Sequence, residues 1–69
     1  MSQYPKVVFV QNCKIPMTNV FTGDSKLFTF NRGEINHARL DEKGAGQIYF
    51  LDEEGWGAII NKELVERAN

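Results

Sequence analysis

Few residues of this 69-residue chain have types that could carry chemistry. His37 is the only histidine and Cys13 is the only cysteine. A Cys–His nucleophile would need the two side chains in contact, with a third group orienting the imidazole, and nothing in their spacing favours that contact. We expect His37 to lie on the surface of a strand, and Cys13 to pack as a small apolar residue or to lie free in a loop. The sequence therefore predicts no catalytic residues and no enzyme.

A run of three acids, Asp52, Glu53 and Glu54, comes directly before Gly55. A calcium loop needs acidic ligands at alternating positions, which this run does not provide. One cysteine and one histidine also exclude a disulfide framework, and they exclude a Cys/His zinc site unless carboxylates or a second chain help. We therefore expect no metal and no cofactor, and we interpret the acids as a solvated turn.

Trp56 lies between Gly55 and Gly57, which leave its indole little cover from the adjacent chain. It could pack in the core or at its rim, or it could be an exposed anchor, since tryptophan, tyrosine and arginine dominate interface energetics. Tyr49, if it points outward, would extend the same patch. The candidate protein-binding residues are therefore Trp56, Tyr49, Asp52, Glu53 and Glu54.

The net charge of −1 divides unequally along the chain. Residues 1–39 carry five basic and two acidic side chains, a net of +3, whereas residues 40–69 carry three basic and seven acidic ones, a net of −4. A basic face with exposed Phe21, Phe28, His37 or Tyr4 could bind nucleic acid by phosphate contact and base stacking. Its basic residues would be Lys6, Lys14, Lys26, Arg32 and Arg39. The acidic face could equally bind a basic patch on a protein partner.

Length and composition allow one small core, so residues 1–69 are expected to form a single domain. The hydrophobic share is 42%, and no apolar run approaches the 18 or so residues of a membrane span. The N-terminal residues lack the basic and apolar segments of a secretory signal, so we expect a cytoplasmic protein. Val, Ile and Thr number 13 and the aromatic residues number 8, a composition that favours strands.

Alternation and turn signals predict about five strands, mostly antiparallel, in a small barrel. The strands are expected at residues 6–11, 26–30, 34–40, 47–51 and 56–60. Residues 12–25 are expected to form a long excursion with partial β character, in which Pro16 breaks the ladder, residues 20–22 could be a brief strand and Gly23-Asp24 marks a turn. Residues 41–46 are expected to form a flexible loop. Gly33 and Gly55 should supply the positive φ of two turns. Asn61 is expected to cap a short C-terminal helical turn through Leu64 and Val65.

Two segments resemble parts of the SH3 family. Residues 27–35, LFTFNRGEI, are similar to the strand that leads into the SH3 diverging turn, and residues 55–66, GWGAIINKELVE, are similar to the closing hairpin, one-turn helix and final strand. Together they cover residues 27–66. The resemblance implies an SH3-like barrel, but the proline-binding groove of that family is absent. Asn61 stands at its proline position, Leu64 stands at the following tyrosine position, and Tyr49 and Phe50 lie near its tryptophan pair.

A barrel of this size has little room for a deep substrate pocket. We therefore expect a non-enzymatic protein-binding module or small inhibitor that occupies a surface of a larger protein, of the kind that phages and mobile elements encode. The alternative is a small nucleic-acid-binding barrel that uses the basic residues of the N-terminal half. A homodimer through an exposed edge strand is compatible with this size.

Overall fold

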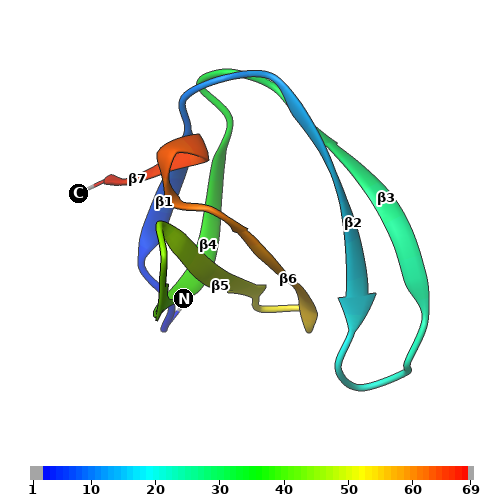
Figure 1. Ribbon diagram of the computed structural model, residues 1–69. Helices are drawn as coiled ribbons and strands as arrows, with labels where there is room; N and C mark the ends of the chain where they lie inside the picture. The colour runs from blue at the N-terminus through cyan, green and yellow to red at the C-terminus, as the bar shows by residue number, and fades with distance from the viewer. Residues whose placement is uncertain (1–2, 69) are drawn as a thin grey trace.

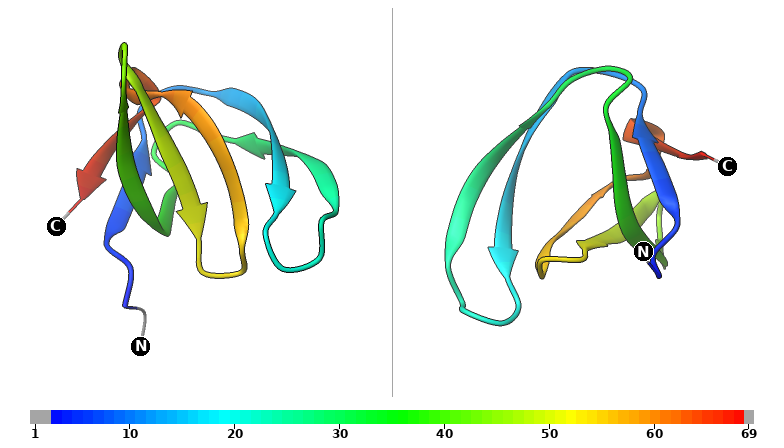
Figure 2. Two further views of the ribbon diagram at one scale, coloured as in Figure 1. Left: turned by 60° about the horizontal axis from the view of Figure 1, so that its bottom comes forward. Right: turned by 180° about the vertical axis from the view of Figure 1, so that it is seen from behind.

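Seven antiparallel strands form one curled sheet in the computed structural model, which describes residues 3–68 (Figure 1). The strands are β1 (Lys6–Phe9), β2 (Cys13–Asn19), β3 (Ser25–Phe30), β4 (Ile35–Gly44), β5 (Gln47–Asp52), β6 (Trp56–Asn61) and β7 (Val65–Ala68). Their order across the sheet is β3-β2-β6-β5-β4-β1-β7, so β3 and β7 are its edges. The sheet curls into a half-barrel around one core, as the three views show (Figures 1 and 2).

The core is built from alternate residues of these strands, as strand geometry requires. Phe9 of β1, Phe30 of β3 and Phe50 of β5 meet at its centre, where the Phe9 and Phe30 rings stack with centroids 4.1 Å apart. The other buried apolar side chains are Val7, Ile15, Met17, Ala38, Ile48, Ile60 and Val65. The strand-rich, all-β prediction is confirmed.

The expected partial β character of residues 12–25 is confirmed, because half of this stretch is β2, paired with β3 from Cys13 to Thr18. The expected break at Pro16 was wrong, and residues 20–22 lie in a turn instead of a brief strand. Pro16 does not break that pairing, because its missing N–H lies on the other side of the strand. On that side, β2 pairs with β6 only through Thr18↔Gly57 and Asn19↔Trp56. Val20 N–H donates to Gly55 C=O, so hydrogen-bonded pairs between β2 and β6 fall at every second residue, at Val20 and then at Thr18. The next bonded pair would be Pro16 opposite Ile59. Proline cannot donate there, so β2 and β6 part.

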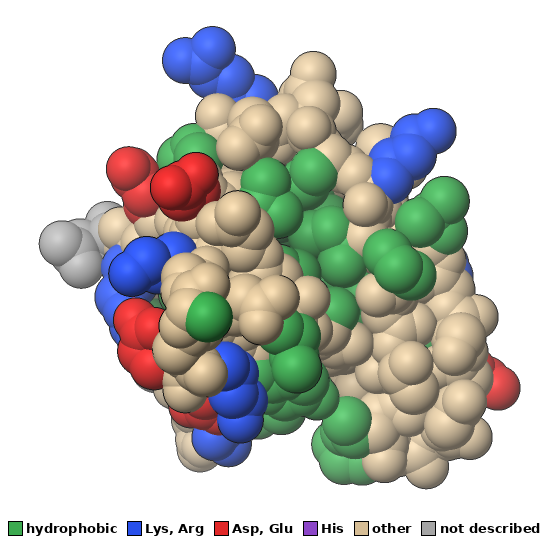
Figure 3. All heavy atoms as spheres, viewed as in Figure 1, with side chains coloured by type: hydrophobic (Ala, Val, Ile, Leu, Met, Phe, Trp, Pro, Cys, Tyr) green, Lys and Arg blue, Asp and Glu red, His purple; other side chains and the backbone are tan. Residues whose placement is uncertain are grey.

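The opening between β2 and β6 exposes apolar side chains. Figure 3 shows them gathered between the part of the molecule that contains β6 and the β2–β3 hairpin. The curl is therefore a half-barrel, with a seam where the ladder stops.

Two other predicted boundaries change. β4 continues through the expected flexible loop as far as Gly44, because a bulge between Glu42 and Gly44 keeps it paired with β5. The C-terminal helical piece is a single 3-10 turn, η1 (Lys62–Leu64), and Val65 begins β7 instead of ending a helix. The Asn61 cap is confirmed, since its side chain accepts a hydrogen bond from Glu63 N–H at 2.9 Å. Within residues 3–68, no helix is long and apolar enough to cross a membrane.

Candidate functional site

The acidic turn between β5 and β6 is organised by its first residue. The Asp52 carboxylate accepts hydrogen bonds from the backbone N–H groups of Glu54 and Trp56, both at 2.9 Å. Gly55 completes the turn with a φ of 96°, as predicted, and donates its N–H to Asp52 C=O at 3.2 Å. Asp52 therefore shapes the turn, whereas the side chains of Glu53 and Glu54 are exposed to solvent.

A second turn, between β2 and β3, docks on this acidic turn, and Asn19 joins the two. The buried Asn19 amide donates to Glu54 C=O at 3.0 Å. Its side-chain oxygen accepts the backbone N–H groups of Phe21 and Thr22 at 2.9 and 3.2 Å. Val20 N–H donates to Gly55 C=O at 2.8 Å. These bonds hold the two turns side by side, where Figure 2 shows them pointing the same way.

Phe21 is the most exposed large apolar side chain among the described residues, at 78% of its possible surface. Its ring nevertheless has a defined seat over Gly55, where a Cβ on that glycine would lie 2.5 Å from the Phe21 ring. Val20, beside it, is 54% exposed. The backbone of this turn is held by hydrogen bonds, and the Phe21 ring rests against Gly55 with most of its surface open to solvent.

The two turns carry negative charge alone. Residues 19–25 and 52–55 contain four acids and no lysine or arginine. At the margin, His37 Nδ1 of β4 lies 4.0 Å from the Glu53 carboxylate, both being partly exposed. We call the whole feature the paired-turn surface, and it consists of Val20, Phe21, Asp24, Glu53 and Glu54.

Trp56 and Tyr49, predicted to share one patch, lie on opposite faces of the sheet. Trp56 lies on the same face of β6 as the buried Ile60, so its side chain points to the inner side of the sheet. There the centroids of the Trp56 and Phe28 rings are 5.2 Å apart. Tyr49 faces outward opposite Ile59, and its ring covers Gly57, where a Cβ would collide with the tyrosine hydroxyl. Both side chains are half-buried. The structure therefore groups Trp56 with the core rim, and it separates Tyr49 from it.

The five basic residues proposed for nucleic acid lie on separate segments: Lys6 on β1, Lys14 on β2, Lys26 on β3, Arg32 in the turn before β4, and Arg39 on β4. Arg39 is paired with Asp41 at 3.0 Å. The Lys26 ammonium lies over the Phe28 and Trp56 rings, 5.1 and 5.9 Å from their centroids. Phe21, one of the expected stacking residues, lies among acids that repel phosphate.

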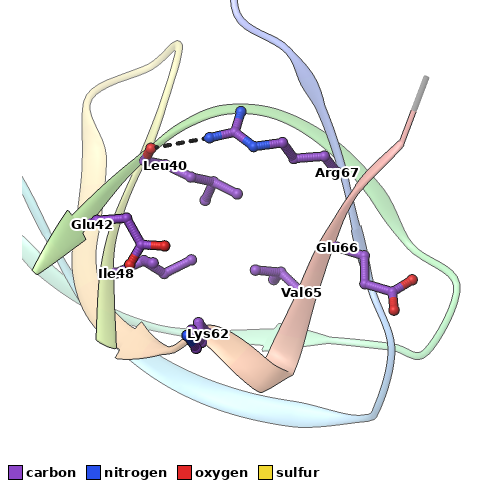
Figure 4. Close-up of a pocket in the computed structure, with 7 residues that line it drawn as sticks. All are labelled: Leu40, Glu42, Ile48, Lys62, Val65, Glu66 and Arg67. Carbon is purple, nitrogen blue, oxygen red and sulfur yellow. Dashed lines mark hydrogen bonds between the residues drawn. The ribbon is translucent and has the colours of Figure 1, made fainter. Parts of the chain in front are cut away.

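A shallow cavity of about 160 Å³ opens between the end of the β4–β5 hairpin, η1 and β7 (Figure 4). An apolar floor and a rim of two acids and two bases line it: Leu40, Glu42, Ile48, Lys62, Val65, Glu66 and Arg67. Arg67 reaches across to donate to Leu40 C=O at 3.4 Å. The cavity is smaller than the roughly 300–1,000 Å³ of typical small-molecule sites. Across residues 3–68, no three His, Cys, Asp or Glu side chains converge as a metal site would require.

Cys13 begins β2 and packs against the edge of the core. Partial burial, and secondarily the negative charge of Glu34, raise the pKa of its thiol above the ordinary value. Both effects disfavour the thiolate, which is the nucleophilic form of cysteine. This environment is opposite to that of an activated cysteine nucleophile.

The sequence interpretation missed Asn19 and Val20 as site residues, and it named Phe21 only as a stacking residue of the alternative nucleic-acid face. The signal was present, because residues 19–24, NVFTGD, place two apolar residues inside a segment rich in turn formers. Apolar residues within a turn have no strand face to bury them. The contact of this segment with the acidic turn could not be recognised from the sequence, because the acidic turn lies more than 30 residues further along the chain.

Comparison with known proteins found no matching family model, no matching curated protein and no matching solved structure.

Proposed function

We propose that this chain is a non-enzymatic protein-binding module or inhibitor whose paired-turn surface docks on a larger protein. The observation that carries the proposal is the Phe21 ring, which is 78% exposed and rests against Gly55, in a turn whose backbone is held by the Asn19 hydrogen bonds. Aromatic side chains, phenylalanine included, are enriched in protein–protein interfaces relative to the rest of the surface.

The chemistry of the surface indicates the chemistry of the partner. Phe21 and Val20 require an apolar pocket, and the surrounding carboxylates of Asp24, Glu53 and Glu54 require basic side chains around that pocket. Charge complementarity of this kind accelerates encounter and selects the orientation in which the anchor enters its pocket. Because the backbone of the turn is already held by the Asn19 hydrogen bonds, little backbone entropy would be lost on binding.

We also propose that the fold is an SH3-like barrel that lacks the proline-binding groove. The support is the chain order: β1, a long β2–β3 excursion, the β4–β5–β6 meander, a one-turn helix, and β7 beginning at Val65. Residues 55–66 form the hairpin end, last meander strand, single helical turn and closing strand that the sequence resemblance implies. In this view the β2–β3 hairpin supplies a binding tip instead of one wall of a proline groove.

The test is affinity capture with immobilised wild-type protein and the variants Phe21→Ala and Glu53→Lys/Glu54→Lys. We expect both variants to lose the captured partner, and we expect wild-type capture to weaken as salt rises, because the charges are exposed. Truncating so exposed a side chain should change the free energy of unfolding by no more than about 0.5 kcal/mol, so the loss would not reflect unfolding.

The matched control is Ile35→Ala, which removes an exposed apolar side chain (57% exposed) that lies at the start of β4 and outside the paired-turn surface. It should retain the partner. Trp56→Ala separates the Phe21 anchor from the tryptophan anchor that the sequence had suggested. Because Trp56 lies on the inner face, outside the paired-turn surface, this variant should also retain the partner. A partner that binds Phe21→Ala as well as wild type, or a preparation that captures nucleic acid in place of protein, would refute the proposal.

A further inference from the structure

The free edge of β3 has the features of a self-pairing strand, and they do not depend on the proposed paired-turn function. β3 is one of the two outer strands of the sheet, as the ribbon views show (Figures 1 and 2). The other edge strand, β7, has only four residues and exposes Glu66 and Arg67. Short, charged edges resist pairing, whereas β3 has six residues and a single charge.

The ladder between β2 and β3 determines which backbone groups of β3 face outward. Asn19 N–H donates to Asp24 C=O at 2.8 Å, and bonded and non-bonded pairs then alternate along the hairpin. The bonded pairs on β3 are therefore at Lys26, Phe28 and Phe30. The 3.4 Å contact between the Thr18 and Ser25 hydroxyls fits a non-bonded pair, in which side chains approach more closely. The N–H and C=O groups of Ser25, Leu27 and Thr29 thus point away from β2.

We propose that a second copy of this chain pairs with this edge, β3 against β3, in antiparallel register centred on Leu27. A two-fold axis through Leu27 places Leu27 opposite its own copy, and Ser25 opposite Thr29 of the second copy. Each of these pairs exchanges both backbone hydrogen bonds, so every outward group of the three residues finds a partner.

The side chains on both faces suit this register. On the outer face, Leu27 is 59% exposed and would meet the Leu27 of the second copy, extending the apolar pair that Leu27 forms with Pro16 of β2. On the inner face, Lys26 would lie opposite Phe28 of the second copy in the closer, non-bonded pairing. The Lys26 ammonium already lies 5.1 Å from the centroid of the Phe28 ring in its own chain. In the dimer it would also face the Phe28 ring of the second copy, which is a second cation–π contact of the same kind. A strand from an unrelated protein would match this register only by chance.

The test is sedimentation velocity and light scattering over concentrations from about 1 μM to about 1 mM. Wild-type protein should shift from monomer to dimer as concentration rises. Leu27→Lys places two ammonium groups directly opposite each other and should weaken self-association by on the order of 100-fold. Thr29→Pro removes an outward N–H without removing a bond to β2, and it should have the same effect.

The control is Ile35→Lys, which adds the same charge at a position of matched exposure on another strand. It should dimerise like wild type. Circular dichroism of all variants separates loss of dimer from loss of fold. Wild type that stays monomeric at every concentration overturns the inference, and so does a dimer that survives both β3 variants or that Ile35→Lys also dissociates. Leu27→Lys should still capture the protein partner, so failure of this inference is distinct from failure of the proposed function.

Discussion

Asn19 is the residue on which the geometry of the paired-turn surface depends. It is the only buried polar residue among the described residues. Its side-chain hydrogen bonds to Phe21, Thr22 and Glu54 all lie within the two turns. A buried amide is tolerated because its partners are backbone groups that would otherwise be unpaired. Its Asx-type bonds to Phe21 and Thr22 are local, whereas its bond to Glu54 is the link that no local pattern could predict.

Replacing Asn19 by alanine should therefore be costly. Asn19→Ala leaves the Phe21 and Thr22 N–H groups and Glu54 C=O without these partners, and we expect it to lower the free energy of unfolding by about 1–3 kcal/mol in urea titration. Asn12→Ala is the control, since its side-chain oxygen accepts one exposed bond, from Arg32 N–H. That variant should lose no more than about 1 kcal/mol. Equal losses in the two variants would contradict the role assigned to Asn19.

Among the elements, most strands could be predicted from the local sequence, but β2 could not. Alternation located β1, β3, β5 and β6 close to their observed bounds, because a strand with one buried face is written in local sequence. It failed at β2, where Pro16 suggested a break. The proline affects only the side of the strand that faces β6, and the side that faces β3 keeps its ladder. Which side of a strand a missing donor occupies is a property of the sheet.

Gly55 is the residue of the acidic turn against which the Phe21 ring rests, and a methyl group at this position should displace the ring. Gly55→Ala forces alanine into a left-handed conformation, at a cost of about 1–2 kcal/mol, and its Cβ displaces the Phe21 ring. Gly33→Ala imposes similar backbone strain (φ of 89°) in open space. We expect both variants to lose stability, but only Gly55→Ala should shift the Phe21 ring resonances in NMR spectra and lose the protein partner. Unchanged Phe21 resonances in Gly55→Ala would contradict the seat described above.

At the scale of the whole molecule, every strand contributes to one small core, against which Cys13 packs. Ionisation of this one thiol should therefore change the free energy of unfolding of the whole protein. The raised pKa of the Cys13 thiol means that the folded state holds its proton to higher pH than the unfolded state does. Stability from this group is therefore complete below the unfolded pKa and is lost as pH rises through the folded pKa. No contribution to pH dependence is expected from it in the acid range.

The measurement is the free energy of unfolding of wild type and Cys13→Ala across neutral and alkaline pH. The free energy of unfolding of the wild type should fall more steeply than that of the variant above the ordinary thiol pKa. The slopes are compared, because the substitution also alters packing. Identical slopes, or a steeper fall in the variant, would contradict the assigned cause.

The sequence by itself determined the all-β fold class and most of the strands, because burial on one face of a strand, capping by Asn61 and the positive φ of Gly33 and Gly55 are local requirements. It also located the acidic turn. Only the tertiary structure decided that Trp56 and Tyr49 lie on opposite faces, that Phe21 is seated on Gly55, and that β3 is an edge. These depend on register and curl between strands distant in the chain, and a shift of one residue in that register would reverse every face.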